Sequence, residues 1–136
     1  MSQENVEGLD LDALGRAAVG AINRDDLDGF LELVHPEVEF TSMIAEAEGE
    51  TFRGHEGVRR WWDVVRGAFS EVLWTVEEVR THEDRGVAKI RIEGTLSGVE
   101  VSLTMWQAAI VRDGMAVWWG FFRAEGEALE AVGLSE

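Results

Sequence analysis

The stretch VEVSLTMWQAAIVRDGMAVWWGFFR, from Val99 to Arg123, decides the fold. Runs of apolar residues flank Arg112-Asp113-Gly114, and Asp-Gly in that position is a strong signal for the turn of a β-hairpin. Side chains alternate between the two faces of a strand, and here both faces are largely apolar. Both faces of the hairpin must therefore be covered. The first strand, from Val99 to Val111, is longer than most strands, so we expect a twisted and curved sheet.

In the rest of the chain, the sequence pattern predicts that most helices come first and that most strands follow them. Apolar residues at helical spacing indicate helices over residues 9–22 and 27–34, and a third helix that carries residues 58–69. Alternating patterns indicate strands over residues 37–42, 71–80 and 87–96, and residues 127–132 indicate one or two final helical turns. We expect one α+β domain over residues 1–136, with residues 1–7 disordered.

Two glycines interrupt the first predicted helix. Gly15 and Gly20 each lower its stability by roughly 1 kcal/mol relative to alanine. Close packing against another element is the interpretation that we favour, and room for a ligand is the alternative.

The composition excludes several classes of function. The chain has 136 residues, with 27 acidic and 12 basic side chains and a formal net charge of −15. This balance disfavours nucleic acids and anionic membranes as partners. The chain has no cysteine, which excludes disulfides, thiolate nucleophiles and cysteine-ligated metals. The first residues do not resemble a signal peptide, and no apolar run approaches the roughly 20 residues of a membrane helix, so we expect a cytoplasmic protein.

Several strings along the chain carry a resemblance to a known family. They are AINRDDLD (residues 21–28), HPEVEF (35–40), FRGHEGVRRWW (52–62), RDG (112–114) and EALEA (127–131). In this order they resemble the SnoaL-like branch of the nuclear transport factor 2-like superfamily, with its ketosteroid isomerases and polyketide cyclases. The resemblance implies a cone-shaped α+β fold, in which a strongly curved, antiparallel or mixed sheet wraps around three N-terminal and central helices and encloses a single pocket. It also implies a homodimer that pairs through the outer face of the sheet, where we expect Trp106 and Trp118.

The family pattern predicts an apolar, tryptophan-lined pocket for a small hydrophobic molecule. The predicted ligand-binding residues are Phe40, Ser42, Trp62, Leu103, Met105, Gln107, Trp119 and Phe121. The pattern also places Val117 on the pocket face. Ordinary small-molecule sites are mostly apolar with few polar groups, and here Gln107 and Ser42 would supply the polar contacts.

The acid–base residues of the related enzymes are missing from these positions. Ketosteroid isomerases place a tyrosine, a general-base aspartate and a second acid where this chain has Ala18, Ser42 and Gln107. Alanine has no donor, and a serine without a partnered base is a poor proton acceptor at neutral pH. SnoaL-type cyclases carry a histidine at the Gln107 position. Gln107 itself keeps a hydrogen-bond donor, and with it a weak oxyanion-type contact.

The catalytic set of the limonene-type epoxide hydrolases is also absent. Its Asp-Arg-Asp residues fall on Ala88, Ile90 and Phe121. Arg91 and Glu93 have a suitable spacing but project from the opposite face, where an ion pair across strands is the favoured interpretation. A shift of one residue would reverse this assignment, because strand faces alternate.

The remaining polar candidates are assigned structural roles. His55 is expected to cap or staple the start of the third helix, with catalysis as the alternative, and His35 and His82 are expected in turns. Glu46 and Glu48 lie on a predicted loop that could cover the pocket, where a buried carboxylate would have a raised pKa and act as a base; a solvated loop is the favoured interpretation. No metal-binding motif is present, so we expect neither a metal nor a cofactor.

The sequence therefore predicts a SnoaL-like domain that binds a small apolar molecule and lacks the usual acid–base residues. Two alternatives stay open. One is an isomerase, cyclase or lyase, and less so an epoxide hydrolase, with a non-standard base. The other is a dimerisation or accessory module whose pocket is filled core.

Overall fold

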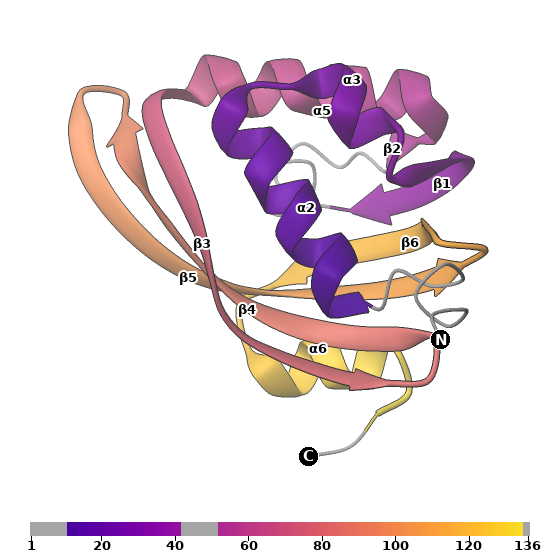
Figure 1. The fold of residues 1–136 in the computed structure, drawn as a ribbon. Coiled ribbons are helices and arrows are strands. Elements are labelled where there is room, and N and C mark those ends of the chain that lie inside the picture. The colour runs from indigo at the N-terminus through magenta and orange to yellow at the C-terminus, as the bar shows by residue number, and fades with distance from the viewer. Residues whose placement is uncertain (1–10, 42–51, 135–136) are drawn as a thin grey trace.

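The computed structural model describes residues 11–41 and 52–134 (Figure 1). Its elements, in order, are α2 (Leu11–Arg24), α3 (Leu27–Leu31), β1 (Val34–Thr41), β2 (Phe52–Arg53), α5 (Gly54–Ala68), β3 (Phe69–His82), β4 (Arg85–Leu96), β5 (Val99–Arg112), β6 (Met115–Phe122) and α6 (Glu125–Ala131). No helix within these two ranges is long and apolar enough to cross a membrane. The predicted disorder of residues 1–7 lies outside the described residues.

The strands form one mixed, six-stranded sheet in the order β2-β1-β6-β5-β4-β3. β1 runs parallel to β6, and the other neighbouring pairs are antiparallel. The sheet is strongly curved and does not close. Helices α2, α3 and α5 lie on its concave side and α6 on its convex side (Figure 1). The predicted α+β fold, a curved sheet wrapped around three helices, is confirmed.

Two-residue turns connect the long strands. Asp113 and Gly114 have φ values of 55° and 78° between β5 and β6, and Ser97 and Gly98 have values of 51° and 83° between β4 and β5. Positive φ at both central residues is typical of the type I′ turns that match the twist of a hairpin. The hairpin that the Asp-Gly dipeptide predicts is therefore present.

A β-bulge in β6 corrects one predicted face. The register between β5 and β6 shifts between Ile110 and Val111, because Val117 is an extra residue in β6. A bulge of one residue moves the residues on one side of it to the opposite face. Ala116 therefore packs in the same inner core as Trp119. It takes the pocket-facing position that the sequence pattern assigns to Val117.

The second predicted helix is shorter, and the strand after it begins earlier, than the sequence pattern indicates. Helix α3 ends at Leu31, and β1 begins at Val34. Pro36 lies where the pairing of β1 with β6 is interrupted, between Val34 and Glu39. Proline has no N–H to donate to a strand ladder, so its position coincides with this irregularity.

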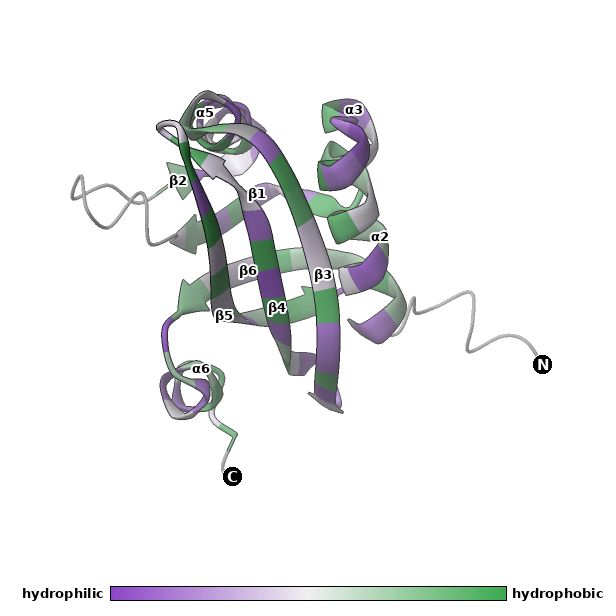
Figure 2. Cartoon of the chain, turned by 90° about the vertical axis from the view of Figure 1, so that its left-hand side faces the viewer, coloured by the Kyte–Doolittle hydropathy of each residue, from purple (hydrophilic) through white to green (hydrophobic). Residues whose placement is uncertain are grey.

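Two apolar clusters cover the two faces of the sheet. The larger one lies between the concave face and helices α2, α3 and α5, and its centre is aromatic. The smaller one lies on the convex face, where Ala128, Leu129 and Val132 pack over Ala108. Trp106, Ile110, Trp118 and Phe122 are partly buried around this second cluster. Figure 2 shows hydrophilic and hydrophobic residues alternating along β3 and β4, as expected for strands with one buried face.

Candidate ligand-binding site

A small cavity of about 50 Å³ lies between helix α2 and the concave face of the sheet. Its lining comes from α2, from α3, β1 and the segment that joins them, and from strands β3 to β6: Leu14, Gly15, Ala18, Phe30, Leu33, Val34, Val79, Gly86, Val87, Ala88, Gln107, Ala109, Ala116 and Trp119. Of these side chains, those of Gln107 and Trp119 carry polar atoms. The lining, as far as the described residues form it, holds no carboxylate, histidine, lysine or arginine.

Gln107 is the one amide side chain in the described lining. It lies on β5 between Ala88 of β4 and Phe121 of β6, and it is half-buried. Its side chain makes no hydrogen bond to residues 11–41 or 52–134. A glutamine amide donates through its nitrogen and accepts through its oxygen. Gln107 is therefore available to a polar group of a ligand.

Trp119 of β6 forms an aromatic wall of the cavity. Its side chain is 2% exposed, and its ring stacks on that of Phe40 with 4.1 Å between the centroids. Phe30 and Trp61 meet the ring edge to face, at 5.6 and 6.0 Å. The indole nitrogen of Trp119 is buried and has no hydrogen-bond partner among the described residues. The neighbouring rings thus fix the position of this donor.

Gly15 of α2 opens space at the cavity. A Cβ atom built on Gly15 would meet no other atom within 4 Å, although the residue is part of the lining. The interpretation of close packing is therefore wrong for Gly15, and the alternative, room for a ligand, agrees with its position. At Gly20, a Cβ atom would meet only the flexible end of Arg24, at 3.2 Å.

The predicted ligand-binding residues separate into two groups in the structure. Gln107 and Trp119 line the cavity. Phe40, Trp62 and Phe121 belong to the buried aromatic cluster and are absent from the described lining. Phe40 is completely buried, because it stacks between other rings. Contact with a ligand stays a prediction for all five residues.

The other predicted contacts lie away from the cavity or outside the described residues. Met105 is partly buried against the inner core, and Leu103 is 41% exposed in the first half of β5. Neither residue is in the described lining. Ser42, Glu46 and Glu48 lie outside the described residues.

Strand irregularities explain part of what the sequence pattern missed. Val79 lines the cavity, yet simple alternation from the buried Trp74 and the inner-facing Val76 would place it on the outer face. The register of β3 shifts between Val76 and Glu78, and this bulge turns Val79 inward. Leu14, which also lines the cavity, could have been found from the sequence, because it belongs to the apolar stripe of the first predicted helix.

The predicted outer-face position of Arg91 and Glu93 is confirmed. Both side chains are exposed, whereas Ile92 between them is buried. Arg91 forms an ion pair with Glu77 on the neighbouring strand β3. Ala88, at one of the positions where epoxide hydrolases carry a catalytic residue, contributes an apolar part of the cavity wall.

His55 joins two elements, as the sequence predicts, whereas His35 and His82 lie in strands β1 and β3 rather than in turns. His55 Nε2 lies 3.0 Å from the carbonyl oxygen of Val34 and so joins the start of α5 to β1. His35 Nδ1 accepts a hydrogen bond from the backbone N–H of Glu37 at 3.0 Å, in β1 rather than in a turn, and His82 is exposed. The described parts of the chain contain no group of three or more histidine, aspartate or glutamate residues that could hold a metal ion.

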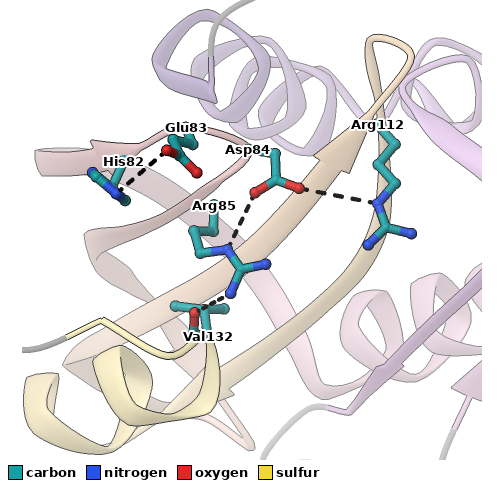
Figure 3. A network of polar contacts seen from close by, with 6 residues as sticks. All are labelled: His82, Glu83, Asp84, Arg85, Arg112 and Val132. Atoms are coloured by element: carbon teal, nitrogen blue, oxygen red, sulfur yellow. Dashed lines mark hydrogen bonds and ion pairs between the residues drawn. The ribbon is translucent and has the colours of Figure 1, made fainter.

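A polar network ties helix α6 to the turn between β3 and β4 (Figure 3). Arg85 Nε donates to Asp84 Oδ1 at 3.2 Å, and Arg85 Nη1 donates to the carbonyl oxygen of Val132 at 2.7 Å. Arg112 Nε lies 4.0 Å from Asp84 Oδ2. The hydrogen bond from Arg85, which outweighs desolvation, holds the pKa of Asp84 below its ordinary value, and the positive charges of Arg85 and Arg112 add to this effect. The network holds α6 against the sheet.

The fold and the apolar cavity under its helices define a class of small α+β domains. The model of the SnoaL-like domain matches residues 16–119 of this chain. The chain therefore belongs to the SnoaL-like domain family. No curated protein sequence matches the chain.

Solved structures with the same fold cover most of this chain. A nuclear transport factor 2-like protein of unknown function from Burkholderia pseudomallei is 21% identical, with a TM-score of 0.74 over 88% of this chain and 95% of that one. TerC, co-crystallized with polyporic acid, is 22% identical, with a TM-score of 0.73 over 86% and 93%. A protein with a ketosteroid isomerase-like fold from Catenulispora acidiphila, in complex with trimethylamine, is 15% identical, with a TM-score of 0.72 over 89% and 92%. At these identities the similarity shows the fold alone.

Proposed function

We propose that the cavity binds a small, largely apolar molecule and that Gln107 makes its polar contact. The observation that carries the proposal is the apolar lining, in which the amide of Gln107 has no hydrogen-bond partner among the described residues. Apolar walls with few, well-placed polar groups are typical of small-molecule sites.

The size of the cavity limits the ligand. Ordinary small-molecule pockets have volumes of roughly 300–1,000 Å³, whereas this cavity has about 50 Å³. A molecule of a few non-hydrogen atoms, or one end of a longer molecule, fits this space. The trimethylamine complex of the Catenulispora protein supports a ligand of this size in a similar fold.

A catalytic role of the isomerase, cyclase or lyase type is the second candidate. The ketosteroid isomerase-like fold of the Catenulispora protein favours it. Such an enzyme needs an acid or a base within hydrogen-bond reach of the reacting group. Among the described lining residues, the amide of Gln107 and the indole of Trp119 are the polar side chains, and neither is a proton acceptor at neutral pH. Binding without acid–base chemistry is therefore better supported.

Native mass spectrometry of freshly purified protein tests the proposal. We expect extra mass from a bound small molecule, which denaturation would release for identification. Gly15→Leu places a side chain in the cavity and should abolish the extra mass. Gly67→Leu in α5 is the matched control, because its Cβ also meets open space but lies outside the described lining. Ligand-free protein that also fails to bind added apolar probes, or equal binding by both variants, would contradict the proposal.

The pH dependence separates the two candidate functions. We expect the affinity for a neutral ligand to stay constant between about pH 5 and pH 9, because the described lining has no side chain that titrates in this range. Turnover of a substrate with a bell-shaped pH profile would instead favour the enzyme.

We further propose that two copies of the protein associate through the convex face of the sheet. Trp106 and Trp118 remain only partly buried beside α6, so a second copy could cover the part of these large apolar side chains that is still accessible.

A further inference from the structure

Three buried indole nitrogens have no hydrogen-bond partner among the described residues: those of Trp61, Trp74 and Trp119. A buried donor without a partner is rare and destabilising, and its persistence calls for an explanation. Trp61 and Trp74 are absent from the described cavity lining, whereas Trp119 is part of it. Trp119 is therefore the member of this group whose side chain borders the cavity.

The strand register places Trp119 close to Gln107. On β5 and β6, Trp119 pairs with Ala109, and Gln107 pairs with Phe121. Trp119 and Gln107 are thus diagonal neighbours on the concave face, a relationship in which long side chains come within reach of one another. Both line the same cavity. One small acceptor group in the cavity could therefore lie near both donors.

We propose that Trp119 determines the ligand class by donating its indole N–H to an acceptor oxygen of the ligand. This inference rests on the proposed function. An indole N–H donates and never accepts, and a carbonyl oxygen has two lone pairs, so one oxygen can take the N–H of Trp119 and the amide N–H of Gln107. A hydrocarbon of the same shape leaves both donors unpaired. The ligand class is therefore a small ketone, ester or aldehyde, or a longer molecule that inserts such a carbonyl group.

Acetone and isobutene are suitable probes, because they have nearly the same shape. Acetone has a C=O group that accepts hydrogen bonds, whereas isobutene has a C=CH₂ group in its place. Their binding is followed by NMR on ¹⁵N-labelled protein, in which the indole N–H signal of Trp119 is assigned in the unmodified chain. We expect acetone to move the Trp119 indole proton downfield. Isobutene should bind without this shift, and the indole signals of Trp61 and Trp74 should stay in place with both probes.

Two variants separate the hydrogen bond from the shape of the cavity. Trp119→Phe should weaken acetone binding about tenfold, the effect of one net hydrogen bond, and should leave isobutene binding within about twofold. Trp74→Phe is the matched control, because it removes another unpartnered indole N–H outside the described lining. It should change neither affinity.

The inference is overturned if acetone binds without moving the Trp119 indole proton, or if Trp119→Phe weakens both probes equally. In either case isobutene binding still supports the proposed function. If neither probe binds, the proposed function fails and this inference fails with it. Should Trp119→Phe not fold, the indole shift in the unmodified chain decides the question alone.

Discussion

The indole N–H of Trp62 donates a hydrogen bond to Asp25 Oδ1 at 2.9 Å, and the same oxygen lies 3.2 Å from Arg66 Nε. Trp62 and Arg66 lie on α5, whereas Asp25 lies in the turn after α2, so this carboxylate joins two helices that cover the concave face. Asp25 also has a φ of 59°, in the left-handed region that aspartate and asparagine tolerate better than most residues. The residue at this position must therefore tolerate a left-handed backbone and also supply a hydrogen-bond acceptor.

We expect Asp25→Ala to lower the free energy of unfolding by about 1–2 kcal/mol, because the buried N–H of Trp62 loses its acceptor. Asp25→Asn keeps an acceptor and tolerates the left-handed backbone, so it should cost less. Chemical denaturation of both variants measures the difference. Combining Asp25→Ala with Trp62→Phe should give less than the sum of the single effects; a fully additive result would show that the hydrogen bond contributes nothing.

Gly15→Ala should raise the free energy of unfolding by up to about 1 kcal/mol, because alanine is the better helix former and its methyl group meets open space. Gly67→Ala in α5 is the matched control, since a Cβ atom there also has no neighbour within 4 Å. Thermal and chemical denaturation should therefore show a gain for both. A loss at Gly15 alone would mean that α2 packs there more tightly than the structure shows.

The fold was largely predictable because its signals are local. The Asp113-Gly114 turn, the apolar stripes of the helices and the alternation that places Arg91 outside all depend on residues close in sequence. The site was less predictable for two physical reasons. A bulge such as the one at Val117 moves the residues on one side of it to the opposite face of the strand. The residue types around a bulge give no sign of this change. In addition, Phe40 and Trp119 are both large and aromatic, and only the tertiary packing decides which one borders a cavity.

The stability contributed by Asp84 should depend on pH. The pKa of Asp84 is lowered in the folded state by the hydrogen bond from Arg85, so the unfolded state takes up a proton first as the pH falls. The contribution is complete above the unfolded pKa of about 3.9, and it is lost as the pH falls through the lower folded value. Asp84→Asn should therefore reduce the free energy of unfolding at neutral pH, and the difference from the unmodified protein should shrink below about pH 4.

The measurement is urea denaturation of both proteins at several pH values. Arg85→Gln serves as the control, because it removes the largest cause of the lowered pKa and should reduce the pH-dependent part of the Asp84→Asn effect to the smaller share that Arg112 and the backbone contribute. Both side chains of the pair are partly accessible to solvent, so 1 M salt should weaken it as well. A difference that grows as the pH falls would have the wrong sign and would refute this account.

The proposed dimer makes a prediction about the convex face. Light scattering should give the mass of two chains of 15.1 kDa each. Trp118→Glu should produce a monomer, because it places a carboxylate in the apolar interface of a chain that already carries a net charge of −15. Val99→Glu is the control: Val99 is 61% exposed and lies at the β4–β5 turn, away from α6, so this variant should remain a dimer. Circular dichroism checks that both variants fold. A monomeric unmodified protein at micromolar concentration would show instead that α6 covers the convex face well enough by itself.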